Sequence, residues 1–152
     1  MAEFYVSVSE QDMAVQIADM LNEHNKWATK FSAQSLLITP ARYFVELENT
    51  TVVGCASHVA EYETLSKIQH ICVLPTHRRR GIAARLTKLA IEYSETEFVY
   101  MTIREDNIAS LNLALSLGFK YITKRWFRDH WTLTYGGRKN HGSRPEYYTR
   151  SL

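Results

Sequence analysis

The chain has 152 residues, of which 45% are hydrophobic and 22% are charged, and its formal net charge is +2. This length suits one domain with a sizeable core and is too short for two ordinary domains. The first residues are acidic and polar where a secretory signal needs a basic and then an apolar region, and no apolar run approaches the roughly 18 residues of a membrane span. We therefore expect a cytoplasmic protein without membrane contact.

The first half of the chain predicts a strand, two helical stretches and three further strands. Residues 4–8 alternate as a short strand, and residues 12–21 repeat apolar side chains at helical spacing. Residues 26–37 are predicted as a shorter, irregular helical stretch. Three β-rich runs follow, at residues 43–48, 51–62 and 66–74. Pro75 ends the last of them, because proline cannot donate to a strand ladder.

The second half alternates helices and strands until the pattern is lost. Apolar residues at steps of three and four predict a helix over residues 82–93. The next predicted elements are a strand at 97–103, a helix at 107–117 and strands at 119–123 and 130–135. From Gly136 onward the sequence is rich in Gly, Arg and Ser without periodicity. We therefore expect residues 1–135 to form the domain and residues 136–152 to form a basic tail that is flexible or loosely docked.

Charge is distributed unevenly along the chain. Residues 1–63 carry a net charge of −6, residues 64–119 carry +2 and residues 120–152 carry +6. An acidic first part suits a cationic amine as ligand, whereas a basic end suits a polyanion such as nucleic acid, although basic tails are more often simply solvated. Charge alone leaves both partners open.

The two cysteines are not spaced as ligands or redox partners. Cys55 and Cys72 lie inside apolar, strand-like stretches and form no CxxC motif. We expect two reduced, buried thiols, with neither a disulfide nor a metal site.

The stretch VLPTHRRRGIAARL, residues 73–86, places three arginines directly before a glycine at a predicted strand-to-helix turn. The start of a helix presents unpaired backbone N–H groups at its positive end and can therefore cradle an anion. Gly81 has no side chain and Ala83 only a methyl group, so a phosphate can approach the backbone closely. The alternative is an ordinary basic helix start, but arginines there oppose the helix dipole unless an anion is bound.

Two motifs resemble those of the GNAT N-acetyltransferases. Arg78-Arg79-Arg80-Gly81-Ile82-Ala83, preceded by Val73-Leu74-Pro75, is similar to the pyrophosphate signature [Q/R]-x-x-G-x-[G/A] of that family. Downstream, the run from Asn107 to Gly118 and Phe119 resembles the segment N-x-x-A-x-x-L-Y-x-x-x-G-F. The resemblance is specific over residues 64–123. It implies an α+β (mixed α/β) fold with a mostly antiparallel sheet of about six to seven strands, splayed between the strand ending near Val73 and the strand starting near Glu97, and about four flanking helices.

The same resemblance implies acetyl-CoA as acetyl donor. Family members hold the pantetheine arm against the strand that ends at the signature and the pyrophosphate on the backbone of the turn, with an asparagine on the cofactor arm; this asparagine also suits a helix N-cap. The implied cofactor-binding residues are Ile71, Cys72, Val73, Arg78, Arg79, Arg80, Gly81, Ile82, Ala83, Ala84 and Asn107.

The resemblance also implies direct transfer of the acetyl group to a primary amine, carried by a protein, a peptide or a small molecule. A backbone N–H such as that of Val73 would stabilise the oxyanion. The family's tyrosine proton donor falls on Ala114, so Ser110, one helical turn earlier, is the expected substitute, unless it is only a surface serine. The family's base positions fall on Lys67, Gln69 and Thr102, and other candidates are Glu61, Glu63, His70 and Glu105.

The acceptor should bind around the mouth of the cleft, by analogy with the family. The segments concerned are residues 23–31 and 124–130, where Trp27, Trp126 and Phe127 would supply an aromatic wall or simply cover the core. Two other functions stay open: an acyl-CoA-binding module with weak or lost catalysis, and an acetyltransferase acting on a nucleic-acid-associated amine. A homodimer also stays open.

Overall fold

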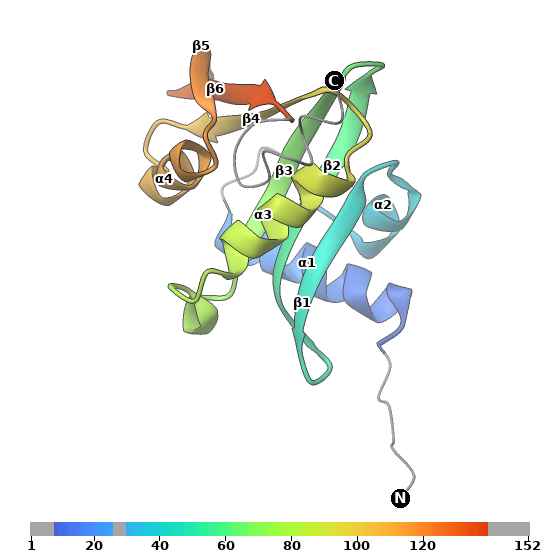
Figure 1. The fold of residues 1–152 in the computed structure, drawn as a ribbon. Coiled ribbons are helices and arrows are strands. Elements are labelled where there is room, and N and C mark those ends of the chain that lie inside the picture. The colour runs from blue at the N-terminus through green and yellow to red at the C-terminus, as the bar shows by residue number, and fades with distance from the viewer. Residues whose placement is uncertain (1–7, 26–29, 140–152) are drawn as a thin grey trace, which may run out of the picture.

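The structure is a computed structural model that describes residues 8–25 and 30–139. Within those residues it contains one six-stranded sheet, in the order β1-β2-β3-β4-β6-β5, and four α-helices (Figure 1). The elements are α1 (Glu10–His24), α2 (Ala33–Ile38), β1 (Arg42–Glu48), β2 (Thr51–Tyr62), β3 (Leu65–Val73), a short 3-10 turn (Pro75–His77), α3 (Ile82–Tyr93), β4 (Phe98–Arg104), α4 (Ile108–Ser116), β5 (Lys120–Phe127) and β6 (His130–Arg138). The predicted fold class is confirmed.

Serine side chains fix where the first two helices begin. The Ser9 side chain accepts a hydrogen bond from the backbone N–H of Asp12 at 3.1 Å, which satisfies one free donor at the start of α1. Ser32 and Ser35 form a reciprocal capping box at the start of α2. These caps fix the first residues of the two helices that precede β1.

The helices cover the two faces of the sheet and create two hydrophobic clusters. α3 packs on β1, β2 and β3 from one face, and α1 contacts β2 and β3 from the other (Figure 1). The cluster under α3 and α4 includes Val53, Ile68, Leu86, Met101 and Phe119. The cluster under α1 and α2 includes Ile17, Leu21, Leu36, Cys55 and Cys72. Both cysteines are buried free thiols, as expected.

The sheet opens into a V between β3 and β4. These two strands run parallel and are paired only from Leu65 opposite Phe98 to Lys67 opposite Tyr100. Beyond that point β3 follows β2, while β4 stays paired with β6 as far as Arg104. The mouth of the V therefore lies at the carboxyl ends of β3 and β4, next to the start of α3. The predicted splay is confirmed.

Several element boundaries differ from the prediction. β5 runs to Phe127 and β6 to Arg138, so residues 136–138, expected in the tail, belong to the sheet. The prediction ended β6 at residue 135 because glycine is unfavourable in strands. The strand nevertheless needs a glycine at position 136, because a Cβ there would lie 2.7 Å from the Val99 carbonyl oxygen. Within the described part of the irregular helix expected at 26–37, residues 30–32 are not helical, and the helix runs over Ala33–Ile38, where the Ser32 cap starts it.

Three predictions concern segments that the structure does not describe. The strand expected at 4–8 lies, apart from its last residue, outside the described residues, as do Trp27 and the tail beyond residue 139. In the part of the chain that is described, no helix is both long and apolar enough to cross a membrane.

Candidate functional site

The turn between β3 and α3 exposes a run of unused backbone donors. Arg79 and Gly81 both have left-handed backbone conformations, with φ of +63° and +76°. Helical bonding resumes when Arg85 N–H donates to the Gly81 carbonyl at 3.0 Å. Among the described residues, none accepts a hydrogen bond from the backbone N–H groups of residues 79–84. The turn thus has the donor arrangement of an anion cradle.

The arginine side chains of the turn mostly brace its backbone. Arg78 Nε donates to the Val73 carbonyl at 3.1 Å, and Arg80 Nη2 donates to the Thr76 carbonyl at 3.3 Å. Arg85 bonds the Arg80 carbonyl at 2.9 Å and pairs with Glu46 of β1. Only the Arg79 guanidinium lacks a partner among the described residues. The sequence indicated that all three arginines contribute charge around the anion cradle. In the structure, Arg78 and Arg80 also stabilise the turn through these hydrogen bonds.

The end of β3 directs backbone groups into the V. Leu74 N–H donates to the Val53 carbonyl of β2 at 2.9 Å. Since backbone groups of successive strand residues point to opposite sides, the N–H and C=O of Val73 face β4. The Val73 carbonyl accepts the hydrogen bond from Arg78 Nε, and the Val73 N–H points into the V. On the same edge, the Ile71 carbonyl accepts from Asn25 Nδ2 at 3.4 Å, so the residue that follows α1 reaches the V.

At the start of α4, the structure places Asn107 as the N-cap, with its Oδ1 accepting from the Ser110 N–H at 3.1 Å. Its amide nitrogen donates to none of the described residues, which is compatible with a second contact to a ligand. Ser110 is half-buried, and its hydroxyl makes no hydrogen bond to a described residue.

Ala114, at the family's tyrosine position, is fully buried. It belongs to the hydrophobic cluster that includes Met101 and Ile103, and its carbonyl accepts from the N–H groups of Leu117 and Phe119. The side of α4 that carries Ala114 is therefore filled by core packing, and a proton donor must come from elsewhere.

A β-bulge in β3 directs the His70 ring toward Phe31 and Tyr43 of β1, with ring centroids 4.7 and 5.8 Å apart. The pairing shifts between Cys55 opposite Cys72 and Ser57 opposite Gln69, and His70 has a φ of +55°. Its Nδ1 lies 2.5 Å from Tyr43 Oη, and Cys55 Sγ donates to its carbonyl at 3.2 Å. Burial, with the nearby Lys67 charge, lowers the pKa of His70 to about 4. His70 is therefore neutral and only weakly basic at pH 7, and nothing in the sequence pattern had signalled the bulge.

The other candidate bases are already engaged or exposed. The Tyr100 hydroxyl donates to a Glu61 carboxylate oxygen, and burial followed by this contact raises the pKa of Tyr100. Glu105 Oε1 accepts from the Trp131 N–H at 3.5 Å, and Glu63 is exposed in the β2–β3 turn. Within the described residues, no group of three or more His, Cys, Asp or Glu side chains is arranged to hold a metal ion.

The tip of the β5–β6 hairpin lies beside the mouth of the V. Glu105 N–H donates to the Trp131 carbonyl at 3.0 Å, and the Arg104 guanidinium lies 3.2 Å from His130 Nδ1. The Trp126 and Trp131 rings meet edge to face at 5.3 Å, yet the Trp126 side chain stays half exposed. The hairpin tip thus exposes aromatic surface beside the mouth of the V, and its role in acceptor binding stays a prediction.

Comparisons with known proteins agree with this geometry. A model described as the Acetyltransferase (GNAT) family matches residues 6–119. N-alpha-acetyltransferase RimI of Mycobacterium tuberculosis is 32% identical over 84 residues, which are 54% of this chain and 51% of that protein. The chain therefore spans about half the length of the curated relative that it matches.

Solved structures share the fold at low sequence identity. The putative acetyltransferase yncA from Salmonella typhimurium, solved with its cofactor acetyl-CoA, superposes with a TM-score of 0.73 at 17% identity, covering 92% of this chain and 96% of that one. The ribosomal-protein-S18-alanine N-acetyltransferase from Escherichia coli gives a TM-score of 0.68 at 17% identity, with 91% and 94% coverage. Both likenesses establish the architecture.

Proposed function

Because the chain belongs to the GNAT acetyltransferase family, we propose that it transfers an acetyl group from acetyl-CoA directly to the primary amine of a peptide or protein. The observation that carries this proposal is the combination of unpaired N–H groups at residues 79–84 with a sheet that opens directly beside them. Acetyl-CoA is the co-substrate typical of the family. The similarity to RimI favours an α-amine as acceptor.

The turn residues fit a diphosphate. A side chain at Gly81 would be strained at its φ of +76° and would place its Cβ 3.4 Å from the Arg85 guanidinium, so the space above the turn depends on a glycine. The six N–H groups of residues 79–84 and the Arg79 guanidinium supply donors and charge. Asn107, with a free amide nitrogen, and the V-facing edge of Ile71 and Val73 would hold the pantetheine arm.

Direct transfer requires that the neutral amine attack the thioester carbonyl carbon, that an oxyanion form there, and that the C–S bond break to release the CoA thiolate. The Val73 N–H is the group of this chain that would stabilise the oxyanion. Arg78 holds the carbonyl of the same residue and thereby fixes the orientation of the strand end. Removal of one such donor typically costs about a hundredfold to a thousandfold in rate.

Proton handling in this site depends little on dedicated side chains. The leaving thiol resembles a cysteine thiol, with a pKa of about 8.5, so its thiolate can depart without a strong acid. Ser110, with a hydroxyl that no described residue engages, is the nearest substitute for the family's tyrosine. Loss of that tyrosine should slow turnover by about tenfold to a hundredfold, less than a full acid–base contribution.

A second candidate function is an acyl-CoA-binding module with weak or lost catalysis. The buried Ala114 favours it, as do Lys67, Gln69 and Thr102 at the family's base positions. The nucleic-acid alternative rests on the basic tail, most of which lies outside the described residues.

The experiment that separates these functions is thiol release from acetyl-CoA over a panel of amines. The panel contains a peptide with a free N-terminus and no lysine, the same peptide with a blocked N-terminus and one lysine, a polyamine and tRNA. We expect thiol release with the first peptide and an acetyl group on its α-amine by mass spectrometry. Binding of acetyl-CoA without thiol release from any amine would favour the binding module, and no binding would overturn both.

A further inference from the structure

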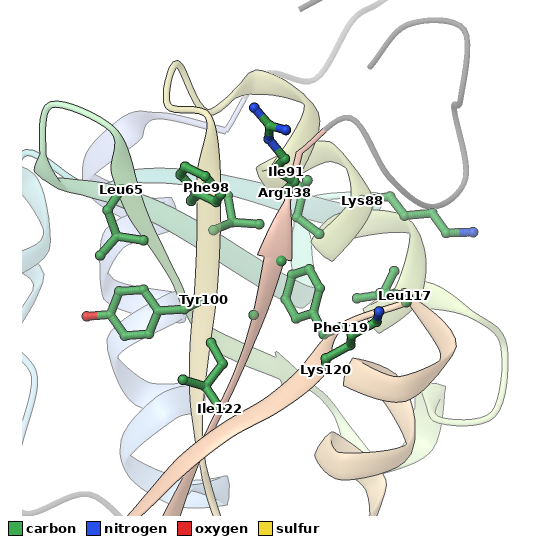
Figure 2. Close-up of a pocket in the computed structure, with 14 residues that line it drawn as sticks. Leu65, Lys88, Ile91, Phe98, Tyr100, Leu117, Phe119, Lys120, Ile122 and Arg138 are labelled. Carbon is green, nitrogen blue, oxygen red and sulfur yellow. The ribbon is translucent and has the colours of Figure 1, made fainter. Parts of the chain in front are cut away.

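The first turn of α3 lies close to the β1–β2 pair. A Cβ added at Gly54 of β2 would lie 2.7 Å from Ile82 Cγ2, so the helix and the sheet leave no room for a side chain there. Glu46 of β1 is the ladder partner of Gly54, and its carboxylate reaches the first turn of the helix. Further along α3, Ile91 instead packs in the hydrophobic cluster that contains Phe119 (Figure 2). The start of α3 is therefore the part of the helix that β1 can hold in place.

Glu46 holds the Arg85 guanidinium at two points. Arg85 Nη2 donates to Glu46 Oε1 at 2.9 Å and to Oε2 at 3.0 Å, and Arg85 Nη1 donates to the Arg80 carbonyl at 2.9 Å. The N–H groups of a guanidinium have a fixed planar arrangement, so a contact at one nitrogen also orients the other. A single arginine side chain thus connects β1 to the turn between β3 and α3.

The Arg80 carbonyl belongs to the same peptide unit as the Gly81 N–H. Because a trans peptide unit is planar, its C=O and N–H point in opposite directions. The hydrogen bond from Arg85 therefore keeps the Gly81 N–H on the far side of the peptide unit, where it donates to none of the described residues. This N–H is one of the donors that the anion cradle presents.

A second carboxylate of β1 supports the same turn. Glu48 Oε2 lies 2.6 Å from His77 Nε2, and His77 Nδ1 lies 2.8 Å from Thr76 Oγ1. The Thr76 carbonyl in turn accepts from Arg80 Nη2 at 3.3 Å. Two acidic residues near the end of β1 are thus connected to Arg80, one through its carbonyl and one through its guanidinium.

We propose that Glu46 is a positioning residue for the diphosphate of acetyl-CoA. It fixes the guanidinium that holds the Arg80 carbonyl, and thereby keeps the Gly81 N–H directed into the cradle. The inference rests on the proposed binding of acetyl-CoA at this turn. It is distinguishable from a simple effect of charge, because a carboxylate near an anion site repels the anion. Loss of the Glu46 charge alone would strengthen binding, whereas loss of its positioning role weakens binding.

The test measures the affinity of the full-length chain for coenzyme A, which carries the diphosphate, by titration calorimetry. We expect Glu46→Ala to weaken binding roughly threefold to tenfold, as for one hydrogen bond lost in the turn, and to raise the KM for acetyl-CoA without lowering kcat. The effect is modest because the Arg85 side chain is 56% exposed and its ion pair is partly screened.

Glu46→Gln is the matched control. It removes the same charge but keeps one oxygen that can accept a hydrogen bond from Arg85, so it should weaken binding less than Glu46→Ala does. Thermal unfolding verifies that both variants are folded. Unchanged or tighter binding by Glu46→Ala would overturn the proposal, as would equal effects of the two substitutions.

A double-mutant cycle tests whether Glu46 acts through Arg85. Arg85→Met removes the guanidinium and should itself weaken binding of coenzyme A. In that background Glu46→Ala should cause no further loss, and an equal loss in both backgrounds would overturn the proposal. The readout separates this inference from the proposed function, because affinity is measured without turnover. Binding of coenzyme A without thiol release from any amine contradicts only the proposed transfer, whereas no binding by the unmodified chain overturns both.

Discussion

The left-handed backbone conformation of Gly81 shapes the turn that we propose binds the diphosphate. Its φ of +76° is accessible to glycine, and the turn it forms leaves the next N–H groups unpaired. The sequence predicted this from glycine placement alone, because a helix start after three arginines needs a feature that admits an anion. It could not predict that Arg78 and Arg80 turn back onto the turn, since side-chain direction depends on carbonyls that the fold brings near.

Gly81→Glu should abolish acetyl-CoA binding, because the carboxylate would occupy and repel the diphosphate position. Gly81→Ala is the matched control. Both substitutions put a Cβ on a left-handed residue and should lower the free energy of unfolding by about 1 to 2 kcal/mol, but the alanine variant should keep measurable binding. Calorimetry with acetyl-CoA and thermal unfolding distinguish the two effects, and binding by the glutamate variant within twofold of the original would contradict the cofactor assignment.

Arg78→Lys should lower kcat while changing the KM for acetyl-CoA less than threefold. Lysine keeps the positive charge but lacks the Nε that bonds the Val73 carbonyl, so the strand end loses one hydrogen bond, worth about 0.5 to 1.5 kcal/mol. This corresponds to roughly a threefold to tenfold loss of rate. Arg79→Lys, at a side chain with no described partner, should leave kcat unchanged. Equal losses in both variants would contradict the specific role of the Arg78–Val73 contact, because Arg79 makes no such bond.

At the scale of elements, the order of helices and strands was predictable and the irregularities were not. Hydrophobic periodicity gave α3, β4 and α4 within a few residues, because each buries one continuous apolar face. The bulge at His70 has no such signature, since it appears only when β3 pairs with β2 and one residue is left over. β6 was predicted too short because its last pairs depend on glycines, which strand propensity disfavours.

Ala114 tests how tightly α4 packs on β4. Ala114→Tyr should destabilise the fold by about 1 to 3 kcal/mol, because a phenol ring does not fit a fully buried position, and it should not raise thioester turnover. Ala109→Tyr, on the exposed side of the same helix, is the control and should change stability little. Chemical denaturation measures both. A stable Ala114→Tyr variant with clearly faster thiol release would show that α4 accommodates the family's proton donor.

For the whole molecule, the sequence shows an acidic first part and a basic end. It does not show that elements from both parts lie beside the V. α1 and the β5–β6 hairpin come from opposite ends of the chain, and both reach the V, through Asn25 on one side and Trp131 on the other. The strand order brings the hairpin to this place, since β6 inserts between β4 and β5. The proposed acceptor face therefore depends on the sheet topology, which local sequence patterns do not encode.

The pH dependence of the reaction tests the whole site at once. The pKa of His70 is lowered to about 4, so this side chain stays neutral from pH 5 upward and contributes no ionisation near neutrality. The acceptor must lose a proton before it attacks, so kcat/KM should rise with pH until it passes the pKa of the amine itself. That pKa is about 8 for a peptide α-amine and about 10.4 for a lysine side chain.

We therefore expect the inflection in kcat/KM to move upward by about two pH units when the α-amine acceptor is replaced by a lysine-type amine, in proportion to this difference in pKa. Rates measured from about pH 5.5 to about pH 11, a range that spans both amine pKa values, give the comparison, and His70→Gln should leave each inflection where it is. An inflection that stays near pH 6 to 7 for both amines would mean that a side chain of the protein removes the proton. Its disappearance in the His70→Gln variant would identify the bulge as the site of that base, and would show that binding of the substrates raises the pKa of His70 toward neutrality.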